Sequence, residues 1–162
     1  MSTVVASRRQ KFDLKAFLLS VGGTLAVGFL GGLAGGTAGF EQLIKPPLTP
    51  PAVVFPIVWT ALYALMGLAA YLIWSSGDLD RAACLRVYTA QLFVSALWPL
   101  IFFRLGLRLV AFFWLLLLVA LLTLTLSGFR YIRKSAYWLL LPTLLWVLFA
   151  GYLNLGFYLL NA

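Results

Sequence analysis

Five long apolar runs dominate the sequence, and short polar segments separate them. About 20 apolar residues in a helix cross the hydrocarbon of a bilayer, and a segment in lipid must satisfy its own backbone polar groups. We therefore predict an all-α membrane protein with one domain, residues 1–162. It should form a five-transmembrane-helix bundle whose spans lie at about 16–38, 53–74, 87–103, 109–127 and 137–160.

Composition supports residence in the lipid bilayer. Hydrophobic residues make up 64% of the 162 residues and charged residues only 10%, whereas about 25% are charged in a typical soluble domain. The net charge is +8, but the basic residues cluster at the ends of the apolar runs, where they fix topology and meet lipid headgroups. Nucleic acid is therefore not an expected partner.

The basic residues also predict an orientation. One side of the membrane would carry nine of them, and the other side would carry three: Lys45, Arg104 and Arg108. The nine are Arg8, Arg9, Lys11, Lys15, Arg81, Arg86, Arg130, Arg133 and Lys134. The positive-inside rule then places the N-terminus in the cytoplasm and the C-terminus outside, in what we expect to be a bacterial plasma membrane.

Several kinds of chemistry are disfavoured. The chain has no histidine and a single cysteine, Cys84, so we expect no metal site, no disulfide and no Ser-His-Asp type of hydrolysis. The five predicted spans contain no Asp, Glu, Lys, Arg or His. Such residues normally mark proton relays and ion pathways, so ion-coupled transport is also disfavoured.

Glycines recur at intervals of four in the first span. Gly28, Gly32 and Gly36 form one series, and Gly31, Gly35 and Gly39 form another. In a bilayer, such small residues let two helix backbones approach closely. The two glycine faces are equally consistent with tight packing inside the monomer and with a homodimer contact.

A proline-rich segment leads into the second span. Residues 45–66 read KPPLTPPAVVFPIVWTALYALM. Proline cannot donate to a helix ladder and disfavours helix in the residue before it, so the loop 40–52 should form a stiff cap that includes Lys45, Pro46, Pro50 and Pro51. Either of the last two prolines suits the first turn of the helix that follows. Two interpretations fit this segment: a cap over a pocket, or simply the start of a membrane helix.

Aromatic and weakly polar side chains share helix faces in three spans, and together they form our candidate ligand-binding set. Spacings of three, four and seven residues place side chains on one face. The set is Phe55, Trp59 and Tyr63 in the second span, Gln91, Ser95 and Trp98 in the third, and Trp146, Ala150 and Asn154 in the fifth. Such residues suit a flat, rigid, conjugated ligand. For Gln91 and Asn154, hydrogen bonding between helices is an equally good interpretation.

Three motifs carry a resemblance to a known family. The run KPPLTPPAVVFPIVWTALYALM, the third-span run AQLFVSALWPLIFF and the fifth-span run LPTLLWVLFAGYLN resemble, in order, motifs of the translocator protein / tryptophan-rich sensory protein family, once called the peripheral benzodiazepine receptor. The resemblance covers nearly the whole chain. It implies a five-helix bundle, usually dimeric, with a pocket closed by the loop after the first helix.

The resemblance also implies a function. Family members bind porphyrins and related tetrapyrroles, and some bacterial members are associated with light-dependent breakdown of protoporphyrin through pocket tryptophans. By position, these tryptophans correspond to Trp59 and Trp146, which would be catalytic only if photochemistry occurs. Leu48 stands where the family's loop tryptophan is common and Gly39-Phe40 replaces a frequent Trp-Tyr pair, so the lid here is less aromatic. Ser95 and Thr143 replace the family's third-helix asparagine and fifth-helix tyrosine. No cofactor is expected apart from the tetrapyrrole as ligand.

Two other functions stay open at this point. One is a transporter of hydrophobic or amphipathic molecules, for which the sequence shows neither an energy source nor an inverted repeat. The other is a regulatory membrane protein that uses the glycine faces of its first span for contact. A receptor-like protein that binds flat hydrophobic ligands is the favoured interpretation.

Overall fold

The computed structural model describes residues 12–36 and 39–162, and this part of the chain is helical without strands. The helices are α1 (Leu14–Gly35), α2 (Val54–Trp74), α3 (Arg81–Pro99), α4 (Arg108–Ile132) and α5 (Lys134–Leu160). A short 3₁₀ turn, η1 (Phe40–Gln42), lies in the loop after α1, and a π-helical segment, η2 (Leu100–Arg104), continues α3. All five long helices are apolar enough to cross a membrane.

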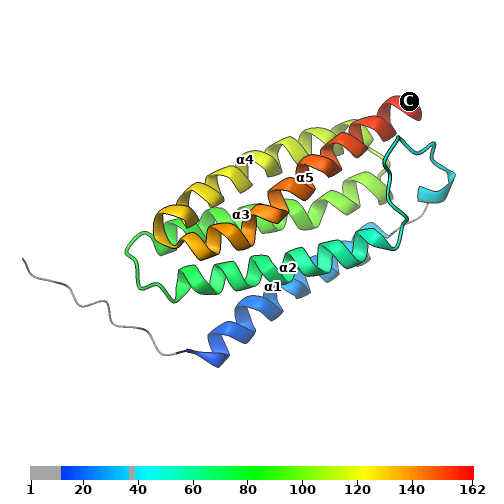
Figure 1. Cartoon of the computed structure of the whole chain (residues 1–162). Coiled ribbons are helices and arrows are strands. Elements are labelled where there is room, and N and C mark those ends of the chain that lie inside the picture. The colour runs from blue at the N-terminus through cyan, green and yellow to red at the C-terminus, as the bar shows by residue number, and fades with distance from the viewer. Residues whose placement is uncertain (1–11, 37–38) are drawn as a thin grey trace, which may run out of the picture.

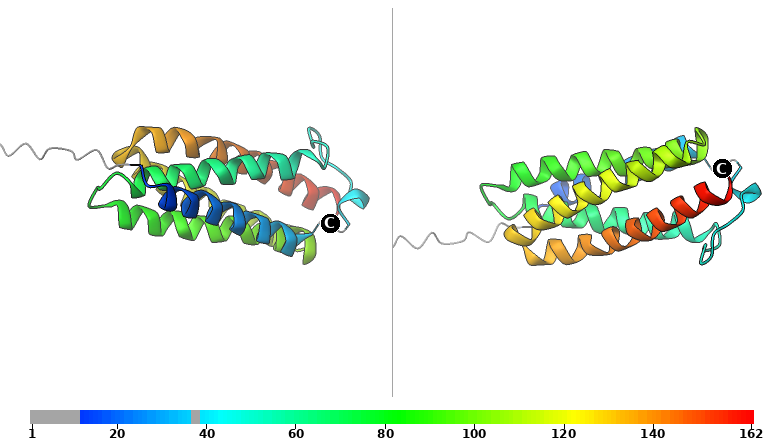
Figure 2. Two further views of the ribbon diagram at one scale, coloured as in Figure 1. Left: turned by 90° about the horizontal axis from the view of Figure 1, so that it is seen from below. Right: turned by 90° about the horizontal axis from the view of Figure 1, so that it is seen from above.

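The helices form a closed ring in which sequence neighbours run antiparallel (Figures 1 and 2). Helix α1 packs on α2 and α3, α2 packs on α5, and α4 lies between α3 and α5. The proline loop, the α3–α4 turn and the C-terminus share one end of the bundle (Figure 1). The core contains fully buried Leu, Phe and Met side chains, including Met66, Leu118 and Phe129.

The structure extends several predicted spans into the polar ends of the runs. Helix α3 begins at Arg81 rather than near 87, and α5 begins at Lys134. The first helix ends at Gly35, and its predicted continuation through 37–38 lies outside the described residues. Hydropathy marks the part of a helix that sits in hydrocarbon, whereas basic residues at the interface remain helical and keep their charge in water.

One prediction about a helix start is corrected. Helix α2 begins at Val54, three residues after Pro51, so the proline in its first turn is Pro56. The N-cap position of α3 is Asp80. The Asp78 carboxylate accepts a hydrogen bond from the Asp80 N–H at 2.8 Å, an Asx turn that precedes the helix.

Two glycines of α1 allow this helix to pack closely on α3. A Cβ atom at Gly31 would lie 2.4 Å from the backbone oxygen of Ala96, and one at Gly35 would lie 2.5 Å from Pro99. These two glycines therefore allow close packing of α1 on α3 inside the monomer. Gly39 has left the helix and adopts a φ of 79°. The homodimer stays a prediction.

Candidate functional site

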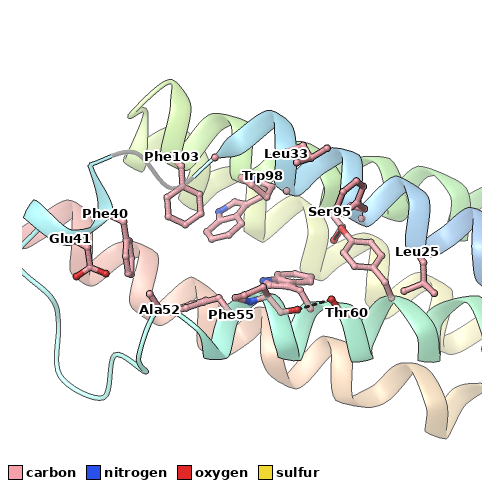
Figure 3. Close-up of a pocket in the computed structure, with 18 residues that line it drawn as sticks. Leu25, Leu33, Phe40, Glu41, Ala52, Phe55, Thr60, Ser95, Trp98 and Phe103 are labelled. Carbon is pink, nitrogen blue, oxygen red and sulfur yellow. Dashed lines mark hydrogen bonds between the residues drawn. The ribbon is translucent and has the colours of Figure 1, made fainter.

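A cavity of about 620 Å³ lies between α1, α2 and α3 at the loop end of the bundle (Figure 3). Its volume is within the range of about 300–1,000 Å³ that is usual for small-molecule sites. Helix α1 supplies Leu25, Gly28, Phe29, Gly32 and Leu33, its C-cap residue Gly36 follows, and the loop supplies Phe40, Glu41 and Ala52. The other lining residues are Phe55, Pro56, Trp59, Thr60 and Tyr63 from α2, and Ser95, Trp98, Pro99 and Phe103 from α3 and η2.

The cavity has aromatic walls on both sides. The ring of Trp59 lies 5.8 Å from that of Tyr63 and 6.4 Å from that of Trp98. Behind them, Trp98 packs on Phe102 at 5.2 Å and on Phe103 at 5.8 Å. These separations are usual for aromatic pairs, so the two indoles are held at the cavity by a packed cluster.

A pair of hydroxyl groups lies at the inner end of the cavity. The hydroxyl oxygens of Tyr63 and Ser95 are 3.1 Å apart, and both side chains are buried. Two hydroxyl groups carry two protons but form one hydrogen bond with each other. Whichever group accepts that bond keeps its own O–H available, and the pair can therefore donate to a carbonyl or ring nitrogen of a ligand.

Trp98 is fixed by a hydrogen bond that crosses the bundle. Its indole N–H donates to the Asn154 side-chain oxygen at 3.0 Å, and the Asn154 amide donates to the Arg108 carbonyl at 2.7 Å. One asparagine thus joins α3, α4 and α5. Asn154 supports the indole from behind and does not line the cavity.

The loop closes the end of the bundle by packing on α5. Phe40 is buried among Phe55, Phe103 and Phe157. The Asn161 side chain accepts from the Ile44 N–H at 2.9 Å and donates to the Ile44 carbonyl at 3.0 Å.

One further contact ties the same loop to α5, and an ion pair lies within the loop. The Tyr152 hydroxyl donates to the Pro47 carbonyl at 3.1 Å, and Lys45 pairs with Glu41 at 2.7 Å. The loop is therefore attached at several points along its length.

Five members of the predicted binding set line the cavity: Phe55, Trp59, Tyr63, Ser95 and Trp98. The predicted cap residues Lys45, Pro46, Pro50 and Pro51 lie outside its lining, and Phe40, Glu41 and Ala52 take their place. Pro46 instead packs on α5, because a Cβ at Gly156 would lie 2.6 Å from it.

The other four members of the set lie outside the cavity. Gln91 is fully buried and donates weakly to the Met66 sulfur at 3.6 Å. Trp146 lies behind Phe55, with ring centroids 6.0 Å apart. Ala150 and Asn154 border a separate space of only about 10 Å³, which is at most the room that one water molecule needs.

The contribution of α1 was missed by the sequence interpretation. Gly28, Gly32 and Gly36 line the cavity, although their spacing was interpreted as packing or dimerisation. A Cβ at Gly32 or Gly36 would meet nothing within 4 Å, so these two glycines leave room in the cavity. A Cβ at Gly28 would lie 2.4 Å from the Tyr63 ring, so this glycine allows α1 to pack on α2. The same spacing produces both outcomes, so only the position of α2 and α3 distinguishes them.

These features define an integral membrane protein of five helices with an apolar, aromatic-lined cavity near one membrane face. Comparison with known proteins is more specific, because a family model described as the TspO/MBR family matches residues 20–159. The chain belongs to this family.

Three relatives illustrate the breadth of the match. The tryptophan-rich protein TspO of Archaeoglobus fulgidus is 36% identical over 153 residues, which cover 93% of this chain and 99% of the relative. The translocator protein of Ovis aries is 35% identical, covering 83% and 80%. The tryptophan-rich sensory protein of Cereibacter sphaeroides is 33% identical, covering 71% and 72%. The family resemblance predicted from the motifs is confirmed.

Proposed function

We propose that this membrane protein binds a porphyrin or a related flat tetrapyrrole in the cavity between α1, α2 and α3. The observation that carries the proposal is a space of about 620 Å³ with the rings of Trp59 and Trp98 at its wall, 6.4 Å apart. A flat conjugated macrocycle has large faces for indole contact. Family membership supports the same ligand class.

The physics of a membrane site favours this kind of ligand. A hydrophobic molecule that leaves lipid for the cavity gains little from removal of apolar area from water. Selectivity must then come from shape, from ring contacts of about 0.5–1.5 kcal/mol per pair, and from a few polar groups. Trp59 and Trp98 supply the ring contacts, and the Tyr63–Ser95 pair supplies a donor for a ring nitrogen or a carbonyl.

A second part of the proposal concerns light. An excited porphyrin is a strong one-electron oxidant, and the indole of Trp59 is a donor at the cavity wall. Transfer of one electron would leave an indole radical cation and a porphyrin radical anion. Dissolved oxygen would take the electron from the anion and become superoxide, and the indole radical cation would regain an electron from the porphyrin. Superoxide would then add to the porphyrin radical cation, so that light and one O2 convert the porphyrin to an oxygenated product and leave the indole unchanged. Trp146 lies one aromatic layer further out, behind Phe55, and can act as a second donor through that ring.

The test is the absorption spectrum of protein purified from cells that overproduce porphyrin, recorded before and after illumination in air. We expect a porphyrin band at about one ligand per chain, and loss of that band in light. Trp59→Phe should keep the band in the dark and slow its loss in light. Protein that is folded but carries no porphyrin would overturn the binding proposal. Equal bleaching of wild type and Trp59→Phe would overturn the role of Trp59.

A further inference from the structure

The cavity borders two different surfaces, and they differ in how firmly they are closed. At the loop end, Phe40 is buried against three other phenylalanine rings. Asn161 holds both backbone polar groups of Ile44, and Tyr152 holds the carbonyl of Pro47. Lifting the loop would break these hydrogen bonds together and expose Phe40 to water.

The side between α1 and α2 is built differently. At the far end the two helices touch, because a Cβ at Gly67 would lie 2.7 Å from the backbone of Val21. Towards the loop end they separate, as the left view of Figure 2 shows. A Cβ at Gly32, which lines the cavity, would meet nothing within 4 Å.

The edges of this gap are exposed and apolar. On α1, Phe29 is 67% exposed and Leu33 is 62% exposed, and both line the cavity. On α2, Pro56 and Thr60 are exposed and line the cavity. Figure 3 shows Thr60 on the side of the cavity opposite Leu33. The Thr60 hydroxyl donates to the Pro56 carbonyl at 2.7 Å, so this polar group is already satisfied within its own helix and tolerates contact with lipid.

The gap opens at the depth of the hydrocarbon. Thr60 follows the start of α2 at Val54 by six residues, which is about 9 Å along a helix. Helix α2 has 21 residues and is about 32 Å long, close to the thickness of the hydrocarbon of about 30 Å. The edges therefore face acyl chains and not the aqueous phase.

We infer that ligands enter and leave the cavity sideways, from the bilayer through the gap between α1 and α2, while the loop stays closed on α5. The route suits a lipid-soluble ligand, which never has to cross water. Gly32 sits in the entrance, and its lack of a side chain keeps the entrance open. The inference rests on the proposed function for the identity of the ligand, but the entrance itself can be tested without one.

The first experiment uses no porphyrin. Fluorescence of Trp59, taken as the difference between wild type and Trp59→Phe, is measured in vesicles of a phospholipid with brominated acyl chains, which quench on contact. We expect Trp59 to be quenched, and Gly32→Phe to protect it at least twofold. Gly22→Phe is the matched control, because Gly22 is on the same helix, has nothing within 4 Å and does not line the cavity. Absence of quenching in wild type, or equal quenching in both variants, would overturn the inference.

The second experiment measures rates of protoporphyrin transfer between vesicles and protein. A residue that narrows the entrance should lower the association and dissociation rates together, so we expect Gly32→Phe to slow both about tenfold and Gly22→Phe to change neither. Asn161→Ala, which releases Ile44, should leave both rates unchanged.

The contrary outcomes are distinct. Faster exchange in Asn161→Ala would show that the loop is the route. A faster dissociation alone in Gly32→Phe would show that the new ring only fills the cavity. Either result would overturn the inference. Protein that binds no porphyrin would contradict the proposed function, and the quenching experiment would still decide whether the entrance exists.

Discussion

Asn154 joins three helices through one side-chain amide. It accepts from the Trp98 indole and donates to the Arg108 carbonyl, and it is almost fully buried. Buried polar groups in a membrane protein are costly when they lack partners. The asparagine therefore fixes the orientation of a cavity-lining indole and ties α5 to the start of α4.

Replacing Asn154 should destabilise the bundle. Asn154→Leu leaves the indole N–H and the Arg108 carbonyl without this partner, and we expect the free energy of unfolding to fall by about 1–2 kcal/mol. Reversible unfolding in mixed detergent micelles measures the change. Thr123→Val is the control, because the Thr123 hydroxyl is exposed and donates only within its own helix. An equal effect of both substitutions would contradict this role.

The sequence predicted the aromatic part of the site better than its boundaries. Trp59, Tyr63, Ser95 and Trp98 were found because helical spacing shows which side chains share a face. Trp146 also shares a face with Asn154, but spacing does not show which neighbour that face meets. Helix α5 contacts α2 and α4, whereas the cavity lies on the α1 side of α2. Trp146 therefore packs against Phe55 and lies outside the cavity.

At the scale of elements, the contact of α1 with α3 depends on missing side chains. Gly31 meets the backbone of Ala96 and Gly35 meets Pro99. Large apolar side chains on the rest of α1, such as Leu19 and Leu30, face outwards. Close backbone approach is thus a major source of attraction between α1 and the bundle, as expected in lipid, where dispersion replaces the hydrophobic effect.

A methyl group at Gly31 should separate these helices. Its Cβ would lie 2.4 Å from the Ala96 carbonyl oxygen, and backbone cannot rotate away as a side chain can. We expect Gly31→Ala to lower the free energy of unfolding by about 1–3 kcal/mol. Gly23→Ala, where nothing lies within 4 Å, should change it little. The prediction fails if the two variants unfold at the same detergent composition.

Helix number and order were predictable because five apolar runs leave few alternatives. The ends were less predictable. Arg81 and Lys134 are helical, although the predicted apolar runs begin only at residues 87 and 137. The π-helical segment after Pro99 was not predicted, because a proline marks an interruption of the regular hydrogen-bond ladder but does not show which local structure replaces it.

At the scale of the molecule, the two ends of the bundle differ in charge. The end that holds the α2–α3 and α4–α5 turns carries Arg81, Arg86, Arg130, Arg133 and Lys134, and the loop end carries Lys45, Arg104 and Arg108. With an odd number of membrane helices the termini lie on opposite sides. The excess of basic residues predicts that the loop, the cavity and the C-terminus face away from the cytoplasm.

Labelling of introduced cysteines tests this orientation. In a Cys84→Ala background, an impermeant thiol reagent added to intact cells should label Ala162→Cys and should not label Ser2→Cys until the membrane is opened. The positive-inside rule supplies the reason, because translocation of basic segments is disfavoured. The reverse pattern of labelling would invert the assignment of sides.

The most direct test of the account is the affinity for protoporphyrin of three tryptophan variants, with unfolding stability measured beside it. Loss of one ring contact of about 0.5–1.5 kcal/mol corresponds to about two- to tenfold in the dissociation constant. We predict that much weakening for Trp59→Leu, which lines the cavity. Trp146→Leu and the lipid-exposed control Trp138→Leu should stay within about twofold of wild type. Weakening by Trp146→Leu with Trp59→Leu unchanged would contradict a ligand site between α1, α2 and α3.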